Sequence, residues 1–204
     1  MIDDASPLVL GSLSPRRREI LETLRLPFVV VSAQVDEEVR PDETPDAYLS
    51  RVVRDKLAAV ARIAPSHGRA LLVADTVVIA DGVILGKPRD PADAERMIAR
   101  LSGREHEVAT RFAIADLRGA DPSAPVHEET VRTRVFFREL SDDEIRRYVA
   151  TGEGTDKAGA YAIQGIGSFA VSRIVGSYPN VVGLPACEVV VALQGLGLLG
   201  SYPR

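Results

Sequence analysis

The sequence predicts an α/β fold with a mixed, twisted sheet and flanking helices. Of the 204 residues, 46 % are hydrophobic and 26 % are charged, which is the balance of an ordinary globular protein. Short apolar runs typical of strands are interspersed with segments of helical period along the chain. The two kinds of segment do not alternate strictly, so we expect a mixed sheet rather than a purely parallel one.

The first strand is predicted at Leu8-Val9-Leu10, and the second begins at Phe28 and ends at Val31. Between them, Ser14 followed by Pro15 is a typical helix start, because serine caps the first turn and proline suits its first position. Thr44-Pro45 repeats this signal and opens a longer helix to about residue 63. Lys56 lies on the apolar side of that helix, together with Leu49, Val52, Val53 and Val60.

A strong strand is expected from Leu71 to Ala80, and Asp81-Gly82 is a preferred pair for a tight hairpin turn. The chain returns through Val83-Ile84-Leu85. A helix from Pro91 to Leu101 follows and ends at Ser102-Gly103. Two further strands are predicted at about residues 107–115 and 130–137, joined by a loop at residues 116–125.

Ser141 and Glu144 form a predicted capping box, with Leu140 and Ile145 as a hydrophobic staple, and this helix ends near Gly152. The last strand is expected at residues 169–174, and the last helix from about Ala186. The stretch of residues 177–185 has the composition of a loop.

Composition excludes several classes of function. The single cysteine, Cys187, allows no internal disulfide and fits a reducing cytoplasm. The acidic start and the lack of an apolar run of about 20 residues predict neither a signal peptide nor a membrane partner. A net charge of −4 and an aromatic content of 5 % argue against nucleic-acid binding.

Ser12, Ser14, Arg16 and Arg17 surround a strand-to-helix junction. The free N–H groups at a helix start attract anions, whereas arginines in the first turn oppose the helix dipole. A bound phosphate would reverse that penalty. The alternative is a capped helix with two solvated arginines.

Asp75 interrupts an otherwise apolar strand. A carboxylate there needs a metal, a base or firm hydrogen bonds, because burying an unpaired charge is costly. Lys87, in Gly86-Lys87-Pro88, follows the hairpin that carries Asp75 and is a candidate to bring an ammonium group close to it. Lys56 is a second candidate, unless its side chain only extends past apolar neighbours to water.

Residues 156–165 (DKAGAYAIQG) place glycines and small residues around a tyrosine and Gln164, both expected to be buried. The amide of Gln164 offers a donor and an acceptor, which suits the edge of a base. The alternative is a glycine-rich bend between two elements. The acidic run Asp36-Glu37-Glu38 is a candidate source of metal ligands or a solvated surface.

Taken in order, these segments resemble the Maf family of nucleoside-triphosphate pyrophosphatases over nearly the whole chain, residues 1–204, as a single domain of two lobes. The resemblance is carried by Ser-x-Ser-Pro-Arg-Arg, Ala-Asp-Thr, Gly-Lys-Pro, the LSGRxH pattern at residues 101–106 and the DKAGAYxIQG stretch. Gly11 departs from the family, where alanine is common, and Leu13 replaces a smaller residue.

The resemblance implies a fold related to inosine-triphosphate pyrophosphatases, with two lobes around a cleft, and usually a homodimer. It implies hydrolysis between the α and β phosphates with a divalent cation, Mg²⁺ or Mn²⁺. The position of Asp75 is the family's proton acceptor. Arg16, Thr76 and Gln164 match the branch that acts on dTTP and UTP.

The predicted activity is therefore a dTTP/UTP pyrophosphatase that cleans the nucleotide pool. Asp75 would activate water, and Arg16, Arg17, Lys56 and Lys87 would neutralise phosphate charge. Ser12 and Ser14 would hold phosphate oxygens, Thr76 and Gln164 would select the base, and Asp75, Glu37 and Glu38 are the candidate metal ligands. The alternatives are a septum regulator that acts by binding a partner, and a pyrophosphatase with broader base preference.

Overall fold

The computed structural model describes residues 1–203 and divides into two compact units, each of which is described by itself. Unit 1 comprises Met1–Asp75, Thr110–Thr130 and Gly183–Arg204, and unit 2 comprises Thr76–Ala109 and Val131–Val182. The arrangement of two lobes around a cleft that the resemblance implies stays a prediction.

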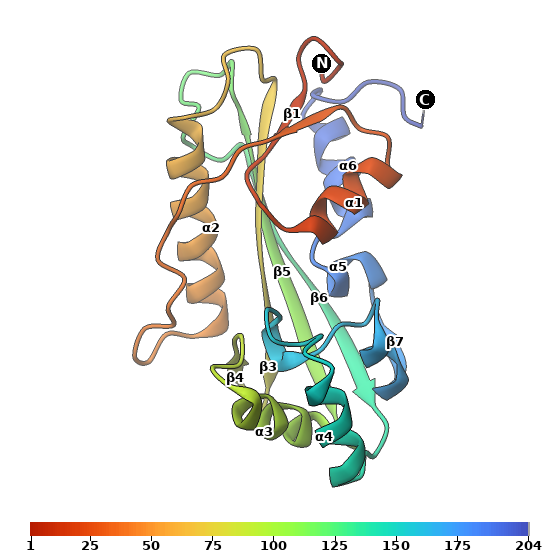
Figure 1. The fold of residues 1–204 in the computed structure, drawn as a ribbon. Coiled ribbons are helices and arrows are strands. Elements are labelled where there is room, and N and C mark those ends of the chain that lie inside the picture. Colours follow the sequence, from red (N-terminus) through yellow and green to blue (C-terminus); the bar gives the residue numbers. More distant parts are fainter. Residues whose placement is uncertain (204) are drawn as a thin grey trace. The chain divides into compact units, whose positions relative to one another are not determined.

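The sheet has seven strands in the order β2-β1-β3-β5-β6-β7, with β4 paired to β3 (Figure 1). The strands are β1 (Leu8–Leu10), β2 (Phe28–Val30), β3 (Ala70–Ala80), β4 (Val83–Leu85), β5 (Glu105–Asp116), β6 (His127–Phe137) and β7 (Val171–Val175). β1 runs parallel to β2 and β3, whereas β4 is antiparallel to β3 and β7 is antiparallel to β6. The predicted mixed sheet is confirmed.

The α-helices begin close to the predicted capping signals. They are α1 (Pro15–Thr23), α2 (Pro45–Ala61), α3 (Pro91–Leu101), α4 (Asp142–Ala150), α5 (Tyr178–Val182) and α6 (Ala186–Gly195). The Thr44 side chain accepts a hydrogen bond from the N–H of Ala47, and Ser141 and Glu144 form both bonds of the capping box. None of the helices in residues 1–203 has the length and apolar character that crossing a membrane would require.

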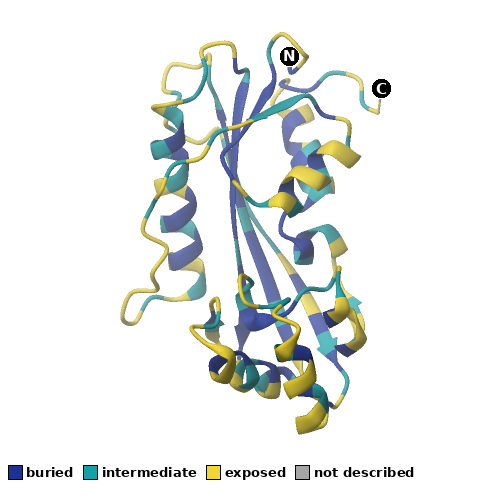
Figure 2. Cartoon of the chain, in the orientation of Figure 1, coloured by how far each residue is buried: buried dark blue, intermediate teal, exposed yellow. Residues whose placement is uncertain are grey.

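In unit 1, α2 covers one face of the strands and α1 and α6 cover the other (Figure 1). The buried stripe of α2 follows the helical period, so that Val53, Leu57 and Val60 pack against Leu71 and Val73 of β3. Figure 2 shows this stripe, because the side of α2 that faces the strands is buried and its outer side is exposed. This packing fixes which residues of α2 lie next to β3.

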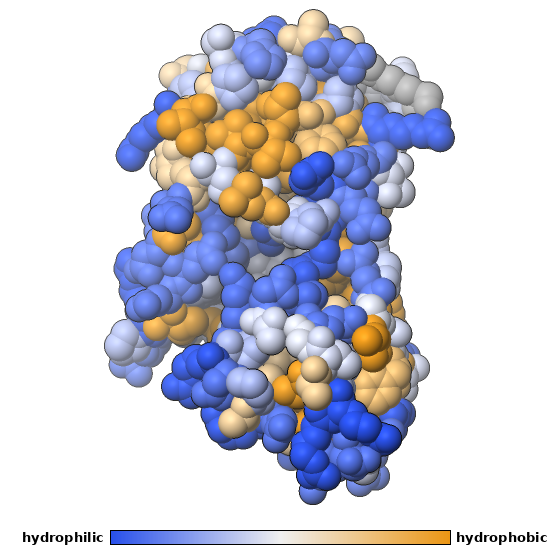
Figure 3. Space-filling view, in the orientation of Figure 1, coloured by the Kyte–Doolittle hydropathy of each residue, from blue (hydrophilic) through white to orange (hydrophobic). Residues whose placement is uncertain are grey.

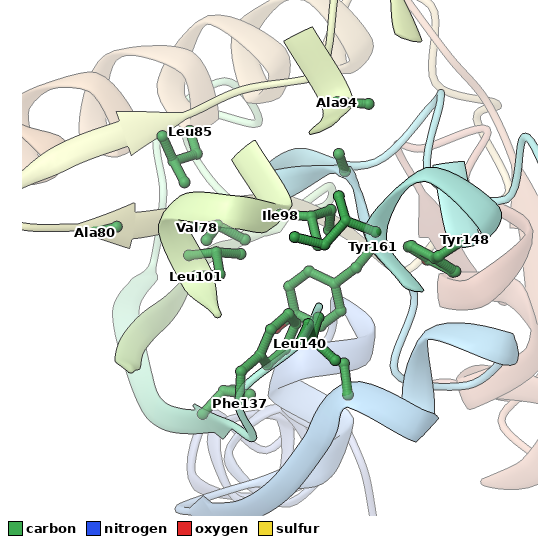
Figure 4. Close-up of a cluster of buried hydrophobic side chains, with 14 of the residues drawn as sticks. Val78, Ala80, Leu85, Ala94, Ile98, Leu101, Phe137, Leu140, Tyr148 and Tyr161 are labelled. Atoms are coloured by element: carbon green, nitrogen blue, oxygen red, sulfur yellow. The ribbon is translucent and has the colours of Figure 1, made fainter. Parts of the chain in front are cut away.

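In unit 2, β3 and β4 form the predicted hairpin, because Asp81 (φ 52°) and Gly82 (φ 76°) both adopt the positive φ that such a turn needs. In the same unit, α3 and α4 contact each other. Their inner faces join Val78, Phe137 and Tyr161 in one apolar cluster (Figure 4). The outer surface of these helices is largely hydrophilic (Figure 3).

Several local predictions are wrong. β7 starts at Val171, because residues 166–170 form a 3₁₀ turn instead of the start of a strand. Residues 177–185 are not wholly a loop, since Tyr178–Val182 forms α5. Ser14 stands at the N-cap position of α1 but its side chain makes no capping hydrogen bond. β5 and β6 extend further than expected, to the edges of the loop that joins them.

Candidate active site

The junction between β1 and α1 is tight because Gly11 has no side chain. A Cβ atom there would lie 2.6 Å from Cγ1 of Val73. The chain then turns through Ser12, which is buried and whose Oγ accepts a hydrogen bond from the N–H of Ser14 at 3.2 Å. Ser14 is partly exposed, and its hydroxyl is not used for capping.

Arg17 in the first turn of α1 is buried, with a relative exposure of 8 %. Its Nε donates to the carbonyl of Gly183 at 2.8 Å, and its Nη1 donates to Oγ of Ser12 at 3.1 Å. Burial lowers the pKa of Arg17, and the nearby charges of Asp75 and Glu37 act in the opposite direction. The alternative of two solvated arginines is therefore excluded for Arg17, while Arg16 is partly exposed.

Lys56 of α2 reaches Asp75 of β3. Its Nζ lies 2.7 Å from Oδ1 of Asp75, and only 11 % and 12 % of the two side chains are exposed. The apolar stripe of α2 packs on β3, which aims this one polar side chain at the carboxylate. Lys56 therefore supplies the partner that a carboxylate within an apolar strand requires.

Glu37 completes a three-membered charge cluster. Its Oε1 lies 2.7 Å from Nζ of Lys56, and 44 % of its side chain is exposed. Glu38 is exposed. Within residues 1–203, the hydrogen bonds recorded for Glu38 involve its backbone N–H and C=O and none reaches Lys56 or Asp75.

The chemistry of Glu37 and Asp75 fits a magnesium ion. No group of three His, Cys, Asp or Glu side chains in the described part of the chain could hold a metal by itself. Mg²⁺ commonly takes only one or two protein carboxylates and completes its shell with waters and substrate phosphates. Two carboxylates that share one ammonium group, one of them partly exposed, meet that requirement.

Unit 2 carries the remaining predicted residues. Lys87 is exposed, directly after Gly86, whose carbonyl accepts a hydrogen bond from the N–H of Gly159 at 3.1 Å. Gly159 has a φ of 69°, and a Cβ there would lie 3.0 Å from Val78. Thr76 shares the strand face of Val78, because side chains two residues apart point to the same side. The loop of Lys87 and the stretch that begins at residue 157 are thus joined within this unit.

Tyr161 is buried as expected, but Gln164 is exposed, so its predicted burial is wrong. Gln164 lies between two 3₁₀ turns, Ala158–Ala160 and Ile166–Ala170. The carboxylate of Glu153 accepts hydrogen bonds from the N–H groups of Ile166 and Gly167 at 2.7 and 2.8 Å. Glu153 therefore holds the end of this bend, and Gln164 within the bend is exposed.

Sequence reasoning assigned no role to His106, although it belongs to the quoted LSGRxH pattern. Its Nε2 lies 2.8 Å from the hydroxyl oxygen of Tyr161, and its ring meets Phe137 edge-on. Burial lowers the pKa of His106 to about 4, which keeps the ring neutral at pH 7. The signal that could have found it is a histidine placed between strand residues of alternating polarity.

The side chains of unit 1 thus define a class of site: a buried acid–base pair beside a serine- and arginine-lined helix start. Such a combination suits acid–base chemistry on a polyanion. The family model described as "Maf-like protein" matches residues 7–196, and the chain belongs to this family. The predicted family is confirmed.

Two relatives match the sequence of this chain over nearly their full lengths. A dTTP/UTP pyrophosphatase of Geobacter sp. (strain M21) is 52 % identical, covering 96 % of this chain and 98 % of the relative. A dTTP/UTP pyrophosphatase of Geotalea uraniireducens (strain Rf4) is 49 % identical, covering 98 % of this chain and 100 % of the relative.

Among solved structures, the Ham1 protein of Staphylococcus aureus is 13 % identical with a TM-score of 0.44, covering 93 % of this chain and 98 % of that chain. A nucleoside-triphosphatase / dITP/XTP pyrophosphatase from Mycobacterium abscessus is 16 % identical with a TM-score of 0.37, covering 97 % and 99 % of the two chains.

Proposed function

We propose that the protein hydrolyses dTTP and UTP to the nucleoside monophosphate and pyrophosphate, and so removes these nucleotides or their modified forms from the pool. The observation that carries the proposal is the 2.7 Å contact between Lys56 and the buried Asp75, in the unit that also holds Ser12 and Arg17. The relatives that are half identical over their full lengths bear the name dTTP/UTP pyrophosphatase.

In the proposed reaction, a water oxygen forms a bond to the α phosphorus, and the bond from that phosphorus to the bridging oxygen of the β phosphate breaks. Asp75 accepts the proton of the attacking water, and the electron pair of the broken bond leaves with pyrophosphate. Arg16, Arg17, Lys56 and Lys87 stabilise the charge that moves toward the leaving group. Ser12 and Ser14 hold phosphate oxygens as hydrogen-bond donors.

Glu37 and Asp75 would hold the divalent cation, and Glu38 is a weaker candidate because, within residues 1–203, no recorded hydrogen bond or ion pair joins it to Lys56. When bound, Mg²⁺ or Mn²⁺ supplies positive charge to the phosphate oxygens. Lys56 would have a second role, since its single positive charge offsets part of the negative charge of the two carboxylates.

Thr76 and Gln164 would select the base. The exposure of Gln164 leaves its amide available to a ligand, and a pyrimidine edge presents the donors and acceptors that an amide matches. We expect Gln164→Glu or Thr76→Lys to shift the preference away from pyrimidines.

The proposal is tested by incubating the protein with separate nucleoside triphosphates and Mg²⁺ or Mn²⁺ while pyrophosphate and orthophosphate are measured independently. Pyrophosphate release that is fastest with dTTP and UTP is the expected result. Equal rates with purine triphosphates would favour the broader pyrophosphatase. Release from none of them would contradict the proposal and favour a regulator that binds a partner. Light scattering on the same sample tests the homodimer that the family resemblance implies.

A further inference from the structure

The segment that carries Glu37 has no regular secondary structure, yet side chains of α2 hold it closely. Residues 31–40 form neither helix nor strand, and residues 36–40 are exposed. Three successive carbonyls of this segment nevertheless accept hydrogen bonds from α2. Arg51 donates to the carbonyls of Asp36 and Glu38 at 3.1 and 2.9 Å, and the hydroxyl of Tyr48 donates to the carbonyl of Glu37 at 3.0 Å.

Arg51 is itself fixed from the other side. Glu43, just before α2, binds its guanidinium through both carboxylate oxygens, at 2.7 and 2.8 Å. Only 14 % of the Arg51 side chain and 9 % of the Glu43 side chain are exposed. Glu43 also accepts a hydrogen bond from the N–H of Arg40 at 3.1 Å, and the guanidinium carbon lies 5.5 Å from the ring centre of Tyr48.

We name Glu43, Tyr48 and Arg51 the α2 clamp. Arginine is suited to the role of Arg51, because its planar guanidinium offers several hydrogen-bond donors in fixed directions, whereas lysine offers a single ammonium group. The clamp holds the carbonyl of Glu37 and the carbonyls on either side of it, so the direction in which Glu37 leaves the backbone is fixed. Its carboxylate then meets Lys56 at 2.7 Å. Lys56 belongs to the same helix, so α2 positions both members of this contact.

We propose that Arg51, assisted by Tyr48, is a positioning residue that acts through Glu37 on the Lys56–Asp75 pair. The effect on turnover rests on the proposed function. Within residues 1–203, no recorded hydrogen bond or ion pair joins Arg51 to Asp75 or Lys56. Loss of Arg51 should therefore reduce turnover only through its effect on Glu37.

A double-mutant cycle tests this dependence. We would measure kcat and KM for dTTP hydrolysis in the wild type, Arg51→Lys, Glu37→Gln and the double variant. We expect each single variant to lose roughly tenfold in kcat, and the double variant to lose no more than about twofold beyond Glu37→Gln, because coupled residues are not additive. Losses that multiply to roughly a hundredfold would overturn the proposal.

Arg54→Lys is the matched control. Arg54 lies one turn further along α2 and also binds a carboxylate through two bonds, to Glu128 at 2.8 and 3.1 Å. Within residues 1–203, no recorded hydrogen bond or ion pair joins Arg54 to residues 36–38. We expect its kcat and KM to stay within about twofold of the wild type. Equal losses in Arg51→Lys and Arg54→Lys would show a general effect on α2 and would contradict the proposal.

Amide hydrogen exchange gives a readout that needs neither substrate nor turnover. In Arg51→Lys, and more weakly in Tyr48→Phe, the amides of residues 36–43 should exchange faster, while those in the buried part of α2 keep wild-type rates. Tyr48→Phe also serves if Arg51→Lys fails to fold. An unchanged exchange rate in residues 36–43 overturns the clamp. If the wild type releases no pyrophosphate, the proposed function fails. The exchange rates alone then test whether the α2 clamp holds residues 36–43.

Discussion

Nζ of Lys56 lies 2.7 Å from Oδ1 of Asp75, with nearly nine-tenths of each side chain buried. One partner belongs to a helix and the other to a strand, so their contact depends on the apolar packing of α2 against β3.

Lys56→Met should destabilise the protein, because it leaves the buried carboxylate of Asp75 without its ammonium partner. Breaking a buried ion pair on one side costs about 3 kcal/mol or more. Urea unfolding at pH 7 measures the loss. The double variant Lys56→Met/Asp75→Asn should recover part of it, and a loss below about 1 kcal/mol in the single variant would contradict this view of the pair.

Arg17→Lys and Arg16→Lys should behave differently although the residues are adjacent. Arg17 is buried and uses two nitrogens for Gly183 and Ser12, which lysine cannot reproduce. We expect a loss of about 2 kcal/mol, or a Tm lower by about 4–8 °C for a chain of this size. Arg16→Lys should leave Tm nearly unchanged and alter KM for dTTP. Equal Tm values for both variants would show that the burial of Arg17 has no structural importance.

Gly11→Ala should destabilise this protein. The added Cβ would lie 2.6 Å from Cγ1 of Val73, and overpacking typically costs about 1–3 kcal/mol. Val73→Ala removes that methyl group, so the double variant should be more stable than the sum of the two single effects. Thermal unfolding of the four proteins tests the coupling, and strict additivity would rule out the clash.

His106 should make stability depend on pH in an identifiable window. Its pKa is about 4 in the folded protein and about 6.5 when unfolded, so the unfolded state alone gains a proton between these values. The stabilising contribution is therefore complete above about pH 6.5 and is lost as pH falls toward 4, by about 3 kcal/mol in total. His106→Gln should be less stable at pH 7 but should lose less on acidification. If the curves of unfolding free energy against pH are parallel for the two proteins, the lowered pKa of His106 is contradicted.

Much of the fold could be predicted because the signals are local. Thr44, Ser141 and the Asp81-Gly82 pair mark helix starts and a hairpin by their own backbone chemistry, and the structure places these elements where they were expected. α5 was missed because five residues give too short a periodic pattern. The burial of Gln164 was predicted wrongly because small residues and glycines around it do not determine which side chains of a bend face solvent.

The site could be predicted as a set of residue types but not as a geometry. Asp75 stood out as a charge within an apolar strand, whereas Arg51 is one of two arginines in α2. Its hydrogen bonds to residues 36 and 38 go to backbone carbonyls, which carry no sequence signal. The contact of Lys56 with Asp75 depends on which helix packs on β3, which is a tertiary property.

The central claim is that Asp75 accepts the proton of the attacking water, and Asp75→Asn tests it most directly. Single-turnover hydrolysis of dTTP should be compared with the Kd of a non-hydrolysable dTTP analogue for both proteins. We predict a rate lower by about 10²–10⁴ and a Kd within a few fold of the wild type. A rate close to that of the wild type would contradict the account.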